Sequence, residues 1–175
     1  TQGVSSAASD VYKRQSLNNP YTGAAAIFCS AIKNDNPPLI YEDGYQRRDF
    51  IHVKDLVKGK LLLLSRPEAD YGIFNIGTGK PTSIIELAET LIELCGKTFN
   101  PDVIYKFRNG DIRDCYADIT KISKLGFQPL FSLKEGLKDL INWSDGQAAI
   151  SNVKDAHRQL VEKGLVLETQ PVSSK

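Results

Sequence analysis

Two adjacent arginines, Arg47 and Arg48, follow the acidic turn Glu42-Asp43-Gly44 in the first half of the chain. A guanidinium group is always charged, and it can bind a phosphate or a carboxylate through two parallel hydrogen bonds. Because neighbouring side chains of an extended segment point to opposite faces, one arginine can face a pocket while the other faces solvent or an acidic partner. The simpler alternative is a surface arginine that is paired with a carboxylate.

The residues around these arginines, 44–55, read Gly-Tyr-Gln-Arg-Arg-Asp-Phe-Ile-His-Val-Lys-Asp. This string resembles the substrate-domain signature of the extended short-chain dehydrogenases, the NAD-dependent sugar-nucleotide epimerases and dehydratases, which carry Arg-Asp-Phe-Ile/Val-His/Tyr-Val-x-Asp. In that family the arginine before the aspartate binds the diphosphate of the nucleotide sugar, so the resemblance implies this role for Arg48. The position of Tyr41 is the family position at which an aromatic residue contacts the base.

A second string, residues 108–118, reads Arg-Asn-Gly-Asp-Ile-Arg-Asp-Cys-Tyr-Ala-Asp and resembles the family's Arg-x-Gly-Asp followed by Ala-Asp. The resemblance implies that Arg108 contacts the diphosphate and that Asp111 binds a ribose hydroxyl. These roles are chemically reasonable, because two guanidinium groups can neutralise a diphosphate and a carboxylate accepts from a hydroxyl. The alternative for Asp111 is a turn or helix-capping residue.

The resemblance also implies a reaction, in which NAD⁺ transiently oxidises a sugar carbon and hydride returns to the other face. The base in this family is a Tyr-x-x-x-Lys pair, and this sequence has neither that pair nor a glycine-rich dinucleotide fingerprint after a strand. The Gly-Thr-Gly of residues 77–79 lacks the third glycine, so we interpret it as a tight strand-to-helix turn. We therefore expect that the chain alone neither binds NAD tightly nor turns over.

Within the family, the C-terminal part of the sequence is most similar to dTDP-L-rhamnose 4-epimerases, and next to UDP-glucose 4-epimerases. The implied ligand is a dTDP- or UDP-hexose, the implied parent reaction is 4-epimerisation, and the implied parent is a homodimer. Two alternatives stay open. The chain could derive from a nucleotide-sugar 4,6-dehydratase or another extended short-chain dehydrogenase, or it could be a non-catalytic binding module.

Composition excludes several other classes of function. The chain of 175 residues is 41% hydrophobic, and its formal net charge is only +1. No long-range field therefore favours nucleic acid or an anionic membrane, and no apolar run is long enough to span a membrane. The three cysteines have no metal-ligand or disulfide spacing, which suits the cytoplasm.

Hydrophobic periodicity predicts a mixed α/β domain. We expect helices over 24–32, 53–64, 84–95, 119–125, 133–143 and 153–163, and strands over 38–41, 50–53, 71–76 and 102–107. On the family resemblance this is a substrate-binding domain whose dinucleotide-binding (Rossmann) half is absent. An exposed apolar face should then mark where that half docks.

The first residues are set apart from this domain. Residues 5–15 back-translate, codon for codon, to a string that resembles a transposase adapter used in sequencing libraries. We therefore predict that 1–15 is a non-native adapter-derived segment, that 16–168 forms the substrate-binding domain, and that 169–175 is a disordered tail.

Overall fold

The computed structural model describes residues 23–108, 111–145, 161 and 166–168. The predictions for the adapter-derived segment 1–15 and the tail 169–175 lie outside these residues, as does nearly all of the predicted helix 153–163. The described part is a mixed α/β fold, as the sequence predicts.

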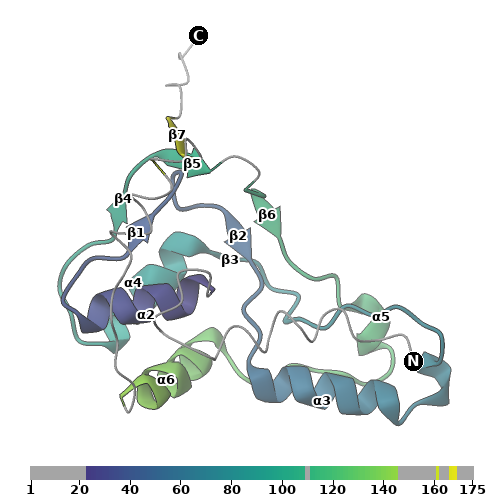
Figure 1. Ribbon diagram of the computed structural model, residues 1–175. Helices are drawn as coiled ribbons and strands as arrows, with labels where there is room; N and C mark the ends of the chain where they lie inside the picture. The colour runs from purple at the N-terminus through teal and green to yellow at the C-terminus, as the bar shows by residue number, and fades with distance from the viewer. Residues whose placement is uncertain (1–22, 109–110, 146–160, 162–165, 169–175) are drawn as a thin grey trace.

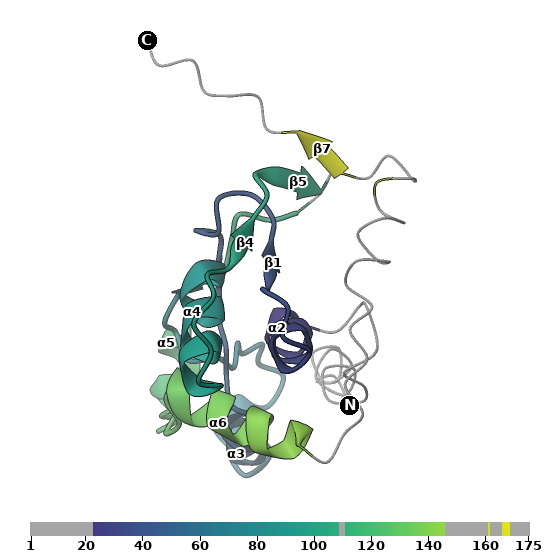
Figure 2. The same cartoon turned by 90° about the vertical axis from the view of Figure 1, so that its left-hand side faces the viewer.

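Three helices form the main core: α2 (Ala24–Lys33), α4 (Ile84–Leu94) and α6 (Leu133–Ser144). They contact one another pairwise, as two perpendicular views show (Figures 1 and 2). Their apolar faces meet in one cluster, made of Phe28, Ile32, Ile40, Ile84, Leu87, Ala88, Leu91, Ile92 and Leu137. All three helices were predicted from their apolar spacing, which is local in sequence.

Two of these helices begin with a capping serine. The hydroxyl of Ser132 accepts the Glu135 N–H while the Glu135 carboxylate accepts the Ser132 N–H, so the two residues form a capping box. At α4, Ser83 Oγ accepts the Glu86 N–H at 3.2 Å. The caps satisfy backbone donors that a helix leaves open and so fix where α4 and α6 start.

The strands are short and form three small sheets. In the first sheet β1 (Leu39–Ile40) runs parallel to β4 (Asp102–Val103). In the second, β2 (Arg47–Arg48) lies between the antiparallel β3 (Thr82–Ser83) and the parallel β6 (Asp114–Cys115). In the third, β5 (Lys106–Arg108) runs antiparallel to β7 (Val166–Glu168). The central strand of the three-stranded sheet therefore consists of the two arginines singled out in the sequence.

Two strand predictions were wrong in their bounds. Residues 50–52 form no strand, because His52 is the N-cap of helix α3 (Val53–Leu64) and its Nδ1 accepts the Lys54 N–H at 3.2 Å. The strand predicted over 102–107 is broken into β4 and β5 by Tyr105, whose φ of 53° is left-handed and incompatible with an extended strand.

The strand predicted over 71–76 is absent as well. The segment follows the 3₁₀ turn η1 (Pro67–Ala69) and shows the alternating exposure of a strand, with Tyr71 and Ile73 exposed. Among the described residues, however, no strand pairs with it. One of its contacts is with helix α5 (Thr120–Ser123), whose Lys121 donates to the Ile73 carbonyl at 2.9 Å.

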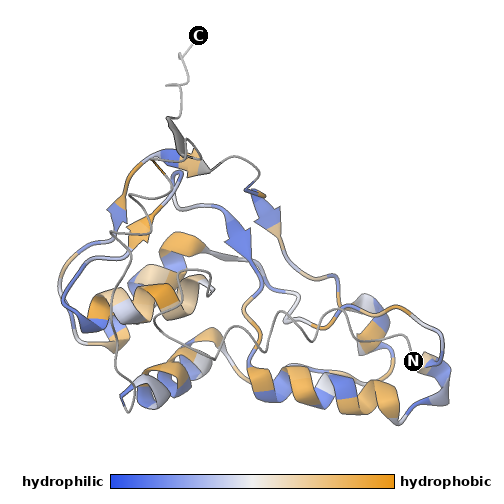
Figure 3. Ribbon diagram, viewed as in Figure 1, coloured by the Kyte–Doolittle hydropathy of each residue, from blue (hydrophilic) through white to orange (hydrophobic). Residues whose placement is uncertain are grey.

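Helix α3 begins beside α6, where Lys54 Nζ lies 3.6 Å from Asp139 Oδ2, and extends away from the helical core (Figure 1). Its apolar side is only partly buried. The apolar spacing of this helix predicts one inward face, made of Val53, Leu56, Val57, Leu61 and Leu64. Leu56 is buried as expected, but Val57, Leu61 and Leu64 are exposed, Leu64 by 85%. The buried side instead centres on Gly59, where an added Cβ would lie 2.8 Å from Ile76 Cγ2 and 3.1 Å from Phe127 Cε2. Figure 3 shows hydrophobic residues along most of this helix.

Candidate functional site

The side chain of Arg47 forms a bidentate ion pair with the carboxylate of Asp114. In the parallel β2–β6 pair Arg47 lies opposite Asp114, and its Nε and Nη2 donate to the two carboxylate oxygens at 2.9 and 2.8 Å. This bond lowers the pKa of Asp114 and raises that of Arg47. The Arg47 guanidinium also lies 5.6 Å from the ring centre of Tyr116. Arg47 is thus the arginine with the acidic partner, one of the two positions the alternation of β2 predicts.

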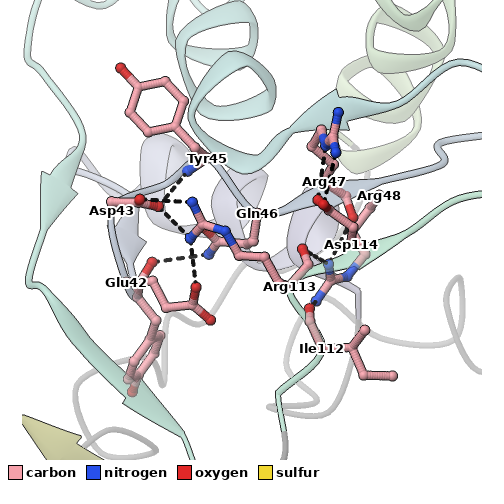
Figure 4. Close-up of polar contacts among 10 residues, drawn as sticks. Glu42, Asp43, Tyr45, Gln46, Arg47, Arg48, Ile112, Arg113 and Asp114 are labelled. Carbon is pink, nitrogen blue, oxygen red and sulfur yellow. Dashed lines mark hydrogen bonds and ion pairs between the residues drawn. The ribbon is translucent and has the colours of Figure 1, made fainter. Parts of the chain in front are cut away.

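Arg48 has a different set of partners, all of them carbonyl oxygens. Its Nη1 donates to the carbonyls of Arg47 at 2.7 Å and Arg113 at 3.0 Å, and its Nη2 donates to that of Ile112 at 2.5 Å. These contacts hold the guanidinium against the backbone of the segment that leads into β6 (Figure 4). Among the described residues no carboxylate forms an ion pair with Arg48.

The three carbonyl bonds leave part of the Arg48 guanidinium available. Arginine has five N–H groups, and these bonds use both protons of Nη1 and one of Nη2. Within the described part of the chain, Nε–H and the second Nη2 proton have no acceptor. Nε and Nη2 are also the pair with which Arg47 grips Asp114. Arg48 can therefore still donate from Nε and Nη2 to an anion, and no carboxylate of the described residues pairs with its charge.

A third arginine, Arg113, closes the acidic turn. Its Nη1 donates to Glu42 Oε2 at 2.7 Å and to Asp43 Oδ1 at 2.6 Å, and its Nη2 donates to Asp43 Oδ2 at 2.8 Å (Figure 4). These bonds hold the pKa of the Asp43 carboxyl below its usual value. The turn is as tight as the sequence predicts, since Gly44 has a φ of 82°.

Tyr41 is tied to the same segment by its backbone. The buried side chain of Gln46 donates from Nε2 to the Tyr41 carbonyl at 3.0 Å. The next residue, Glu42, donates its N–H to the carbonyl of Lys106 in β5 at 2.8 Å. Tyr41 therefore stands between the acidic turn and the strand that ends at Arg108.

The structure brings Asp111 and Arg48 close together in space, because Arg48 donates hydrogen bonds to the carbonyls of Ile112 and Arg113, the two residues that follow Asp111. Asp111 itself is exposed. The backbone of Arg108 ends β5, but its side chain lies outside the described part. Hydrogen bonds to backbone carbonyls thus connect the segments that carry Tyr41, Arg48 and Asp111. The direction of the Arg108 side chain remains a prediction.

One carboxylate beside the arginines had no role in the sequence analysis. Asp49 accepts the N–H groups of Thr78, Gly79 and Ala117 at 2.9 to 3.3 Å, and the Thr78 hydroxyl at 2.6 Å. Asp49 therefore joins the exit of β2 to the Gly-Thr-Gly turn and to the segment after β6. Gly77 is required at this contact, since a Cβ there would lie 2.4 Å from Asp49 Oδ2.

The sequence analysis also missed the partners Asp114 and Arg113. Both lie in the second family-like string, and the alternation of acidic and basic residues in the two strings was a signal that they pair. The pairing itself depends on the register of β2 against β6, which no local pattern specifies.

Comparison with known proteins identifies the family. Residues 4–77 match the family described as the NAD dependent epimerase/dehydratase family. The chain belongs to that family. Over 130 residues it is 34% identical to the dTDP-L-rhamnose 4-epimerase of Burkholderia thailandensis, which covers 74% of this chain and 36% of the relative. Because the family match begins at residue 4, it includes most of segment 1–15, whose non-native origin stays a prediction.

Solved structures of this epimerase/dehydratase family share the fold. The UDP-glucose 4-epimerase of Thermotoga maritima, solved with UDP-glucose, superposes with a TM-score of 0.69 at 34% identity, over 76% of this chain and 42% of that one. The UDP-N-acetylglucosamine 4-epimerase of Methanobrevibacter ruminantium, solved with UDP-N-acetylmuramic acid, gives 0.63 at 35% identity, over 75% and 43%. The chain thus spans about two fifths of the length of its relatives.

Within the described part of the chain, the Gly-x-Gly turn does not fit the dinucleotide cofactor in the family's name. The Gly-x-Gly turn is the nearest candidate for a pyrophosphate cradle, but its Thr78 and Gly79 amides already donate to Asp49. The prediction of a tight strand-to-helix turn was wrong in its flanking elements, because no strand directly precedes residues 77–79 and β3 lies between them and α4. Among the described residues there is also no cluster of potential metal ligands, and none of the helices is long and apolar enough to cross a membrane.

Proposed function

We propose that this chain binds the nucleoside-diphosphate part of a dTDP- or UDP-hexose. Arg48 binds the diphosphate together with Arg108, Asp111 binds a ribose hydroxyl, and Tyr41 contacts the base. The observation that carries the proposal is the state of Arg48. Among the described residues its guanidinium is held by carbonyl oxygens, and its Nε–H and one Nη2 proton remain available to an anion.

The proposed parent reaction is NAD-dependent 4-epimerisation by a homodimer in the cytoplasm, and 4,6-dehydration is the alternative within the family. In either reaction the residues of this chain hold the nucleotide, and they do not distinguish between the two reactions at the sugar. The sequence lacks the Tyr-x-x-x-Lys pair, so we propose that the chain alone binds its ligand without turnover.

We further propose that the exposed apolar side of α3 and the unpaired segment 71–76 receive the dinucleotide-binding half of a longer protein. Two facts favour this occupant. The relatives are more than twice as long as the matched part of this chain, and segment 71–76 keeps strand-like alternation without a described partner strand. Its sequence, Tyr-Gly-Ile-Phe-Asn-Ile, is also largely apolar, as in strands that a parallel sheet buries on both faces.

The nucleotide site is tested by titrating the chain with UDP and dTDP in a calorimeter. Arg48→Ala should weaken binding by about ten- to a hundredfold, because a hydrogen bond to a charged group contributes about 1.5–3 kcal/mol. Arg48→Lys should recover only part of the loss, since lysine keeps the charge without the two parallel donors. Arg66→Ala, an exposed arginine just beyond α3, is the matched control. Equal affinity in the Arg48→Ala and Arg66→Ala variants would contradict the assignment.

A further inference from the structure

Arg113 contacts both parts of the proposed nucleotide site. Its side chain binds the turn that follows Tyr41, through Glu42 and Asp43 (Figure 4). Its backbone carbonyl accepts the Arg47 N–H at 3.0 Å and the Arg48 Nη1–H at 3.0 Å. One residue therefore connects the base side of the site to the arginine on the diphosphate side.

The charge of Arg113 is already used within the protein. Three of its N–H groups bind two carboxylates, so the local cluster of Arg113, Glu42 and Asp43 carries a net negative charge. A diphosphate gains little from such a cluster. The geometry is that of a clamp between two chain segments.

The backbone of the turn at residues 42–44 has a conformation that surrounding contacts must hold in place. Glu42 has a φ of 57°, in the left-handed region that residues other than glycine rarely adopt. Such a conformation persists only where surrounding contacts impose it. Asp43 Oδ1 also accepts the Tyr45 N–H at 2.9 Å, so the carboxylate that Arg113 grips is itself part of the turn.

We propose that Arg113 is a positioning residue of the nucleotide site. It holds the turn after Tyr41 against the segment that carries Asp111, at a spacing that lets one ligand reach both Tyr41 and Arg48. This inference rests on the proposed function, and it adds a residue that never touches the nucleotide. Its effect is on preorganisation, because a ligand that spans two segments binds more weakly when the segments must first be brought together.

The test compares a ligand that spans both segments with one that occupies only the diphosphate side. UDP binding is measured by calorimetry, and inorganic pyrophosphate binding by chemical-shift titration of the Arg48 guanidinium. Arg113→Gln should weaken UDP binding by about five- to tenfold and leave pyrophosphate binding unchanged, since Arg48 is intact. Asp43→Asn removes the other side of the clamp and should give the same pattern.

The control is Lys134→Gln, which breaks an ion pair of 2.7 Å with Glu93 and removes a cation that is 51% exposed, close to the 48% of Arg113. It should change neither affinity. The Arg113 side chain is 48% exposed, so we expect the Arg113→Gln variant to fold. If it does not fold, the Asp43→Asn variant tests the same contact.

The outcomes separate the two proposals. If the wild-type chain binds neither UDP nor pyrophosphate at Arg48, the proposed function is wrong, and so is the positioning role of Arg113 that rests on it. If the wild type binds UDP and the Arg113→Gln and Asp43→Asn variants bind it equally well, only the clamp is wrong. A parallel loss of pyrophosphate binding in Arg113→Gln would make Arg113 a direct ligand and would also overturn the positioning role.

Discussion

The three described arginines of the β2–β6 region differ in what neutralises them. Arg47 faces Asp114, Arg113 faces Glu42 and Asp43, and Arg48 faces only carbonyl oxygens. Exposed ion pairs of this kind add little stability, so their main effect is on geometry and on where positive charge remains. That charge remains at Arg48, the residue to which the family resemblance assigns the diphosphate.

A buried carboxylate, Asp55, provides the clearest stability prediction at the scale of a residue. It is 1% exposed, and its Oδ2 accepts the N–H groups of Leu130 and Phe131 at 2.9 and 3.0 Å. Asp55→Ala leaves both amides without an acceptor, so we expect a loss of about 3 kcal/mol in the free energy of unfolding. Chemical denaturation measures this loss.

Glu89→Ala, which removes a carboxylate from the exposed side of α4, is the control for Asp55→Ala and should change the unfolding free energy by less than about 0.5 kcal/mol. Similar values for the two variants would show that Asp55 does not hold the loop before α6 onto α3.

At the scale of elements, helices were predictable and strands largely were not. The spacing of Leu87, Leu91 and Ile92 and the serine caps of α4 and α6 are local signals, and the structure confirms those helices. The two-residue strands depend on partners far along the chain, as Arg47 depends on Asp114. For the same reason the sequence identified Arg48 as a site residue but gave no sign of its carbonyl partners.

Helix α3 shows the limit of periodicity in a different way. The apolar spacing of α3 predicts one inward face, but only its first half is covered: Leu56 is buried, whereas Val57, Leu61 and Leu64 are exposed. The pattern therefore describes an apolar surface without naming what covers it.

The double variant Leu61→Glu, Leu64→Glu tests that surface. Because both leucines are exposed, the free energy of unfolding should change by less than about 0.5 kcal/mol, while self-association in sedimentation experiments should fall. By contrast, Leu56→Ala on the buried side should cost about 2–5 kcal/mol. A large destabilisation by the double glutamate variant would mean that this face is packed within the chain itself.

At the scale of the molecule, the described residues form a helical core of α2, α4 and α6, the helix α3 that extends from it, and the small sheet that carries the arginines, which lies above α3 in Figure 1. The sheet joins to the core through β3, which leads directly into α4. A ligand at Arg48 would therefore bind at the sheet and leave the hydrophobic core unchanged.

The most direct test of nucleotide binding at this sheet is a residue-by-residue chemical-shift titration of the chain with UDP. We expect the shifts to concentrate at residues 41–48 and 111–116, with the Arg48 side chain among the most affected, and to be small along α3 and the helical core. Shifts confined to α3 or to the core, or no shifts at millimolar UDP, where even weak ligands of about −4 kcal/mol bind, would contradict the account.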